Sequence, residues 1–178
     1  DGDYNTAIGY QALQSQTGTS GAVVNTAVGY LAGKHITTGN SNVAIGGETL
    51  YANLVGSENT AVGNLSGYSI IGSYTTAIGS QAARFASGSS NTFVGQKAGY
   101  GGTTSAPFSS GTDNVAIGKG ALQLFTTGQQ NVSVGTGAGY GITTGYTNTF
   151  VGHWAGDGVT TGATNICIGY NTETSANN

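Results

Sequence analysis

The sequence predicts an all-β fold, a parallel β-solenoid of about ten 17-residue coils. Three observations lead to this prediction. A five-residue phrase recurs ten times, its copies follow one another at a nearly constant spacing, and glycine makes up 33 of the 178 residues. A repeat of this length is too short for a helix and a strand, and such small units bury apolar surface only by stacking on one another.

The glycines mark turns in an ordered chain. Only 6% of the residues are charged, and low charge with many glycines often accompanies disorder, but disordered chains are poor in aromatic and β-branched residues. This chain has ten Tyr and five Phe, with abundant Val, Ile and Thr. We therefore expect glycine to stand where the backbone turns.

The phrase begins with Asn in nine copies and ends with Gly in all ten. The copies start at residues 5, 25, 42, 59, 75, 91, 114, 131, 148 and 165, so the successive steps are 20, 17, 17, 16, 16, 23, 17, 17 and 17. A 17-residue unit accounts for the whole chain once two insertions are allowed, near residues 15–24 and 101–113. We therefore expect residues 1–178 to form one repeat domain.

Each position of the phrase has its own chemistry. The second is Thr, Val or Ile, which suits a pleated strand, and the fifth is Gly, where no Cβ fits. The leading Asn is a turn residue, and we expect it to form an amide ladder between coils. A small residue three positions after the Gly predicts a tight corner. The fourth position is always Ile or Val, and we expect it to be the buried core: Ile8, Val28, Ile45, Val62, Ile78, Val94, Ile117, Val134, Val151 and Ile168.

The rest of the unit places one apolar residue before a polar turn, as in Ile36–Gly39 and Phe125–Gly128. This pattern predicts two short strands and two turns in each coil. So thin a coil buries little by itself. By alternation the second and fourth positions share one face of the strand and the third lies on the other, so both faces are apolar. A homotrimer wound around a common axis would bury the second face, and we expect that assembly.

Several classes of function do not fit the composition. Net charge is −3 and the four Lys and Arg are scattered singly, so we expect no nucleic-acid binding. No apolar run approaches the roughly 20 residues of a membrane span. The single cysteine, Cys167, excludes an internal disulfide framework and is expected to be a packed thiol. The two histidines, His35 and His153, stand in different coils, so we expect no enzyme, catalytic residue, cofactor or metal.

Three groups of residues are candidates for ligand contact. Tyr51, Tyr68, Arg84 and Tyr100 occupy the same position in four consecutive coils and are expected to form an exposed ladder suited to sugar rings or a protein receptor. The longer insertion holds the only proline, Pro107, and is expected to expose Phe108 at its tip. His153 and Trp154 form a third spot. The alternatives are a self-stacked tyrosine row, a neutral bulge and an ordinary corner.

The phrase Asn-x-Ala-Ile/Val-Gly-x-x-Ala resembles the head repeat of trimeric autotransporter adhesins, a left-handed parallel β-roll, and fibre segments of phage tail proteins. The 17-residue spacing and the corners Tyr30–Gly33 and Gln96–Gly99 favour the phage version. Residues 165–178 are similar to the sequence that precedes the intramolecular chaperone domain of endosialidase-type tail fibres and tailspikes. The resemblance implies a trimer in a virion tail fibre or at a cell surface, with a host-surface glycan or protein as receptor.

Four hypotheses follow for function. The first is a trimeric phage tail-fibre segment that spaces or presents receptor contacts, and the second is a bacterial adhesin head of the same architecture. The third is a single-chain solenoid that binds a regular lattice such as ice, because Thr recurs at the second position, although Val43, Val115, Val132 and Ile166 interrupt that row. The fourth is a hydrolase of host polysaccharide, for which the paired carboxylates are lacking.

Overall fold

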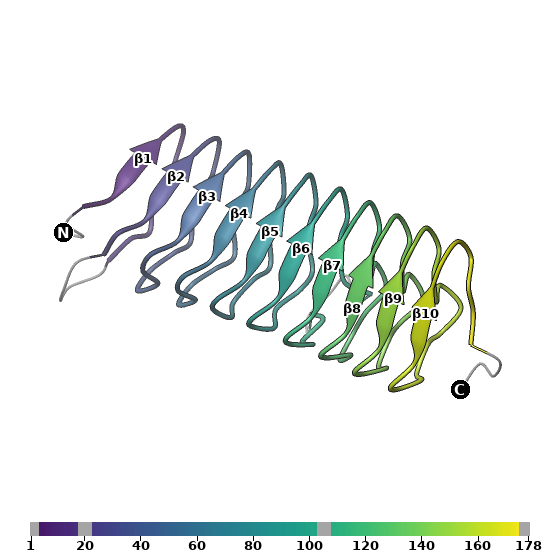
Figure 1. The fold of residues 1–178 in the computed structure, drawn as a ribbon. Coiled ribbons are helices and arrows are strands. Elements are labelled where there is room, and N and C mark those ends of the chain that lie inside the picture. Colours follow the sequence, from purple (N-terminus) through teal and green to yellow (C-terminus); the bar gives the residue numbers. More distant parts are fainter. Residues whose placement is uncertain (1–3, 18–22, 103–107, 175–178) are drawn as a thin grey trace.

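Ten strands of three residues lie side by side in one parallel sheet, in the order of the chain (Figure 1). The computed structural model describes residues 4–17, 23–102 and 108–174, and within these ranges it contains no helix. The strands are β1 (Thr6–Ile8), β2 (Thr26–Val28), β3 (Val43–Ile45), β4 (Thr60–Val62), β5 (Thr76–Ile78), β6 (Thr92–Val94), β7 (Val115–Ile117), β8 (Val132–Val134), β9 (Thr149–Val151) and β10 (Ile166–Ile168). About nine turns of the chain connect them, which confirms the predicted parallel β-solenoid.

Every strand pairs with the next in the register that the repeat predicts. Position for position, Ala7 lies opposite Ala27 and Ile8 opposite Val28, and the same correspondence continues to β9 and β10. The 23-residue step keeps this register, because Thr92 pairs with Val115. The longer steps between phrases therefore do not shift the pairing of the strands.

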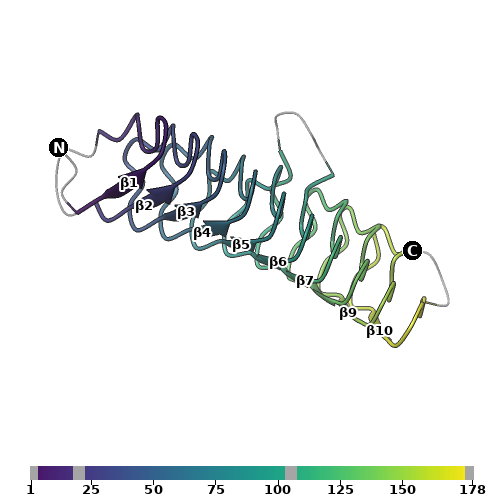
Figure 2. The same cartoon turned by 90° about the horizontal axis from the view of Figure 1, so that it is seen from above.

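The return half of each coil is not a second strand, which corrects the prediction of two strands per coil. Within the described residues it consists of turns and bends, apart from one isolated bridge between Ala86 and Ser109. The reason is backbone conformation. Glu48 and Leu50, at the seventh and ninth positions of their unit, have φ of 53° and 49°, and the same positions in the other coils are also left-handed, except Glu173 in the last one. Their N–H groups still bond from coil to coil, as from Glu48 to the carbonyl of Tyr30 at 2.8 Å. Figure 2, turned by 90°, shows these return segments stacked in successive coils.

The interior of the coil is lined by the third position of the phrase, so the prediction that the fourth position forms the core is wrong. Nine residues at the third position are buried: Ala27, Ala44, Ala61, Ala77, Phe93, Ala116, Ser133, Phe150 and Cys167. The fourth position points the other way, because successive side chains of a strand face opposite sides. Six of its residues are 37–67% exposed, namely Ile8, Ile45, Ile78, Ile117, Val151 and Ile168. The remaining four are half-buried: Val28, Val62, Val94 and Val134.

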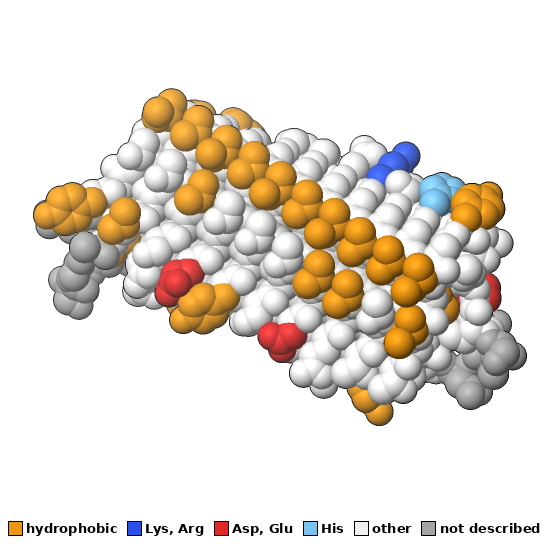
Figure 3. Space-filling model, in the orientation of Figure 1, with side chains coloured by type: hydrophobic (Ala, Val, Ile, Leu, Met, Phe, Trp, Pro, Cys, Tyr) orange, Lys and Arg blue, Asp and Glu red, His pale blue; other side chains and the backbone are white. Residues whose placement is uncertain are grey.

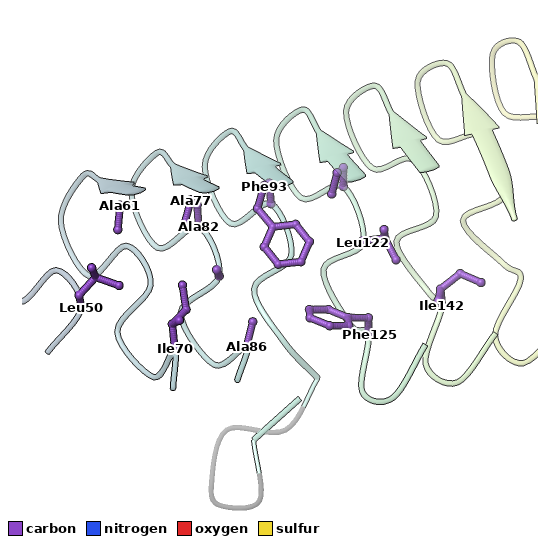
Figure 4. Packing of buried hydrophobic residues seen from close by; sticks show 14 of the residues in the cluster. Leu50, Ala61, Ile70, Ala77, Ala82, Ala86, Phe93, Leu122, Phe125 and Ile142 are labelled. Carbon is purple, nitrogen blue, oxygen red and sulfur yellow. The ribbon is translucent and has the colours of Figure 1, made fainter. Parts of the chain in front are cut away.

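Large and small residues alternate inside the coil so that its small cross-section stays filled. In the coils of β3 and β6 the third and ninth positions of the unit compensate each other: Ala44 faces the interior with Leu50, whereas Phe93 lies against Gly99. A Cβ on Gly99 would come within 2.4 Å of the Phe93 ring. Figure 4 shows Phe93 pointing from the strand layer into the same interior as Phe125, with ring centroids 5.5 Å apart.

The predicted amide ladder is present along one corner of the coil. The N–H of Asn42 donates to the side-chain oxygen of Asn25 at 2.8 Å, and Asn59 repeats the contact to Asn42 at 3.0 Å. The amide nitrogen of Asn42 also donates to the carbonyl of Gly56 across the coil at 2.9 Å. Thr75 replaces Asn in one coil, and there the corresponding contact from Asn91 lengthens to 3.5 Å. The ladder satisfies buried polar groups that the turns would otherwise leave unpaired.

Candidate functional site

The outer face of the sheet is an uncharged apolar surface that runs the whole length of the solenoid. We call it the strand face and define it by the second and fourth positions of the ten strands, which hold only Thr, Val and Ile. Figure 3 shows its hydrophobic side chains as a continuous stripe across the molecule. Two second-position residues add to the exposed apolar area, Val132 and Ile166. The face is regular because every strand is in register with its neighbours and none carries a charge.

The predicted tyrosine ladder is split into two clusters. In the first, Tyr51 and Tyr68 stack with ring centroids 5.0 Å apart and planes 8° from parallel. His35 meets the Tyr51 ring edge-on at 4.7 Å, and the Lys34 ammonium lies 5.9 Å from its centroid. Each of the two tyrosine rings thus covers part of the face of the other, as the self-stacking alternative predicts. Both side chains are half-buried.

The Tyr68 hydroxyl is shifted toward its neutral form. Burial raises its pKa, and the neighbouring Tyr51 and Glu48 raise it further, whereas Arg84 lowers it. The phenol therefore stays a hydrogen-bond donor throughout the neutral pH range. It has no nucleophilic character there.

The second cluster joins the insertion to the ladder. The Arg84 guanidinium lies over the Phe85 ring at 4.9 Å, and Tyr100 meets the same ring edge-on at 5.1 Å. Phe108 stacks on Phe85 at 5.9 Å and is half-buried, so the expectation that it is exposed at a loop tip is wrong. Its ring is held by Phe85, a residue that the sequence did not single out. Pro107 lies outside the described residues.

The third spot, His153 and Trp154, turns out to line a hollow. We call it the Trp154 hollow; it has a volume of about 200 Å³ and lies on the coils that begin with β7, β8 and β9. Its walls are the side chains of Lys119, Gln123, Thr136, Tyr140, His153 and Trp154, together with Gly120 and Gly137. Lys119, Gln123 and Tyr140 were missed as site residues. A signal was present in the sequence, because two consecutive units have Gly at the seventh position and the next has Trp.

Some residues with side chains that could react or bind a metal contribute to packing instead. Cys167 is buried at the third position of β10, and burial followed by the nearby Glu173 raises the pKa of its thiol. The Glu173 carboxyl hydrogen-bonds to Asp157, which raises its pKa, as does partial burial. Within the described ranges, no three His, Cys, Asp or Glu side chains gather in a way that would hold a metal ion.

In the part of the chain that the structure describes, no helix has the length and apolar character needed to cross a membrane. Comparison with known protein families, curated proteins and solved structures finds no match for this chain. The fold defines the class as a β-solenoid repeat protein. A proposal for the function of this chain therefore rests on the surfaces described above.

Proposed function

We propose that this chain is a structural and adhesive segment of a phage tail fibre, assembled as a homotrimer through the strand face and spacing or presenting contacts to a host-cell surface. One observation carries the proposal. The strand face exposes Ile or Val at the fourth position of all ten units and carries no charge.

The size of the strand face supports burial against other chains. Ten rows at a spacing of about 4.8 Å make a stripe about 45 Å long, and two side-chain columns give it an area on the order of 500 Å². That is at the upper end of the apolar patches that monomeric proteins leave open. The Ile and Val side chains of this face gain free energy by packing on a surface of the same kind, whereas the Thr hydroxyls beside them carry no charge.

The regular register supports a parallel assembly of identical chains. Each row of the strand face repeats the one before it, so copies arranged around an axis along the solenoid would meet row against row, and cyclic symmetry closes such an interface. The resemblance of the repeat to trimeric adhesin heads and tail-fibre segments favours three chains. A fibre also needs all its chains to run in one direction, and a rotation axis along the solenoid provides that.

The mass in solution tests the assembly. We expect light scattering at micromolar concentration to give three times 17.6 kDa, about 53 kDa. Ile117→Glu places a charge in the middle of the strand face, where a trimer would bury it, and should give the single-chain mass because an unpaired buried charge is costly.

Thr144→Glu is the matched control. Thr144 is exposed in a turn of the next coil, away from the strands, so the same charge there should leave the mass unchanged. A mass of 17.6 kDa for the unaltered chain would refute the trimer, and an unchanged mass for Ile117→Glu would show that the strand face is not its interface.

Two alternatives keep some support. A bacterial adhesin head would share every feature of the strand face and would differ in what flanks it, a coiled-coil stalk and membrane anchor instead of a chaperone domain. A lattice-binding solenoid is favoured by the flat face with Thr at the second position of β1, β2, β4, β5, β6 and β9. Thermal hysteresis of a chain that stays monomeric would support that alternative over the fibre.

A further inference from the structure

We propose that the Trp154 hollow binds an acidic pyranose, a single sugar ring bearing a carboxylate. The inference names the ligand class for the surface contacts in the proposed function and rests on it for that setting. The hollow itself is built by one chain, so it does not depend on assembly. Three features of the hollow indicate this ligand: the way it forms, the residues that line it, and its charge.

The hollow exists because two consecutive coils lack a side chain at the same position. The coils of β7 and β8 have Gly at the seventh position of the unit, whereas the other eight units have a larger residue there: Gln11, Leu31, Glu48, Leu65, Gln81, Lys97, Trp154 and Asn171. All of these residues take the same left-handed backbone conformation, with φ of 57° at Leu31 and 65° at Gly120. The backbone therefore does not exclude a side chain at Gly120, and the space that such a side chain would occupy is part of the hollow.

Trp154 uses part of that space as a wall. Its indole lies against the backbone of Gly137, where a Cβ would come within 2.5 Å of the ring. The Tyr140 ring stands 5.5 Å away at an angle of 54°, so the two aromatic side chains form inclined walls. His153 meets the indole edge-on at 5.9 Å and stacks on Tyr170 at 5.4 Å. Inclined aromatic walls offer their faces and edges to the C–H groups of a sugar ring.

Polar groups supply the rest of a sugar site. The Gln123 amide donates to the Tyr140 hydroxyl at 3.4 Å, which orients the phenol while leaving the amide oxygen free to accept from a sugar hydroxyl. Thr136 adds a hydroxyl to the lining. A small number of placed polar groups among aromatic walls is the usual composition of a small-ligand site.

The charge of the hollow selects an acidic ligand. Lys119 lines it and is exposed, and no carboxylate is among its lining residues. Asp157 and Glu173 do not belong to the lining, and the Glu173 carboxylate accepts from the backbone N–H of Gly158 at 3.0 Å. The hollow is thus a cationic spot on a chain whose net charge is −3. A carboxylate on the sugar would pair with the Lys119 ammonium.

Fluorescence gives a direct readout, because Trp154 is the only tryptophan of the chain. The probes are methyl glucuronide and methyl glucoside, which differ only in a carboxylate against a hydroxymethyl group, at matched ionic strength. We expect both to change the Trp154 emission with millimolar dissociation constants. The glucuronide should bind about two- to fivefold more tightly, the value of one exposed ion pair.

Two variants test the open space of the hollow and its positive charge separately. Gly120→Leu restores the side chain that the coils of Leu31 and Leu65 carry, and its Cβ would meet the end of the Gln123 side chain at 3.0 Å and the Tyr140 ring at 4.0 Å. It should fill the hollow and weaken both probes about tenfold or more. Lys119→Gln should abolish the preference for the glucuronide over the glucoside, whereas Lys34→Gln, far along the solenoid, should leave that preference and the binding of both probes unchanged.

The results of these experiments distinguish the sugar site in the Trp154 hollow from the proposed trimer. No emission change with either probe up to about 50 mM, well above the expected dissociation constants, would overturn it. Equal binding of the two probes, or a preference that survives Lys119→Gln, would also overturn it. Light scattering of the same samples reports assembly independently, so a single-chain mass with intact glucuronide binding would refute the trimer and leave the sugar site standing.

Discussion

Asn114 illustrates how one side chain can connect three coils. Its amide nitrogen donates to the side-chain oxygen of Asn91 at 3.2 Å and to the carbonyl of Gly128 at 2.9 Å. Its side-chain oxygen accepts from the backbone N–H of Asn131 at 3.0 Å and from the Asn131 amide at 3.1 Å. The residue is fully buried, so water cannot replace these partners.

Asn114→Ala should lower the free energy of unfolding by about 2–4 kcal/mol, because it leaves a buried N–H and a buried carbonyl without partners. Urea denaturation followed by circular dichroism measures the loss. Thr75→Asn is the complementary change, since it would complete the ladder where the contact from Asn91 is now 3.5 Å, and should add about 1 kcal/mol. A loss below about 0.5 kcal/mol for Asn114→Ala, less than one ordinary hydrogen bond, would show that the ladder is not a stabilising element.

Gly118 tests the fifth position of the phrase at the same scale. Its φ is 130°, a region that L residues rarely adopt, and a Cβ would come within 2.5 Å of the Gly135 carbonyl oxygen in the next coil. Gly118→Ala should therefore cost about 3 kcal/mol or more in thermal or chemical unfolding. Gly47→Ala is the control, because the nearest atom to its Cβ is the end of the Asn64 side chain at 3.2 Å. Equal losses for the two changes would contradict the close approach of backbones.

At the scale of the strand and its coil, the sequence predicts the pairing of the strands correctly and their buried face incorrectly. Spacing alone predicted the strands and their parallel pairing, because a repeat that stacks must pair like with like. The face of each strand was assigned wrongly. Ile78 is the larger residue and Ala77 the smaller, yet Ala77 is fully buried and Ile78 is 40% exposed, because large apolar residues of the return segments, such as Leu50 and Ile70, already occupy the interior. Alternation separates two faces of a strand and does not say which one turns inward.

The compensation between the third and ninth positions predicts a rescue. Phe93→Ala should cost about 3–5 kcal/mol by leaving a cavity, and Gly99→Leu should also destabilise because of the Phe93 ring at 2.4 Å from its Cβ. The double variant recreates the pair Ala44 and Leu50 found in the coil of β3. We expect it to recover most of the loss, a favourable coupling free energy of about 2 kcal/mol or more.

Unfolding free energies of the three variants and the unaltered chain give the coupling directly. Leu50 has φ of 49° and Gly99 has 54°, so the leucine is placed on a backbone that already accommodates it. Simple addition of the two single losses would show that the coil does not balance its volume within one unit.

At the scale of the whole molecule, the candidate sites depend on contacts that sequence columns cannot show. Column reasoning predicted one ladder from Tyr51 to Tyr100, whereas Arg84 turns to Phe85 and divides it. It also placed Phe108 at a tip, because the length of an insertion does not reveal that Phe85 holds its ring. His153 and Trp154 were found, but their partners Tyr140 and Lys119 lie one and two coils away. Residues that contact each other across coils lie at the same corner of the solenoid. They need not occupy the same position of the 17-residue unit.

The solenoid as a whole should tolerate the loss of one complete unit. Deleting residues 42–58 removes the stretch from the start of one phrase to the start of the next and joins Ser41 to Asn59. Ser41 has φ of 56° and Glu58, which it replaces, has 57°, so the chain enters the next strand in the same conformation. Inside the coil, Ala27 and Gly33 would meet Ala61 and Gly67, so the main cost is the loss of Leu50, which now packs beside Gly67. The amide ladder would then run from Asn25 to Asn59.

We expect the shortened chain to fold cooperatively, with a β-type circular dichroism spectrum and a solenoid shorter by one strand spacing, about 4.8 Å, in small-angle scattering. Deletion of residues 42–50 is the control. It removes the strand and part of the return segment and leaves the remainder out of register, so every contact that links one coil to the next is lost at that point. Unfolding of the whole-unit deletion, or folding of the shorter one, would contradict a molecule held together by like positions stacking on like.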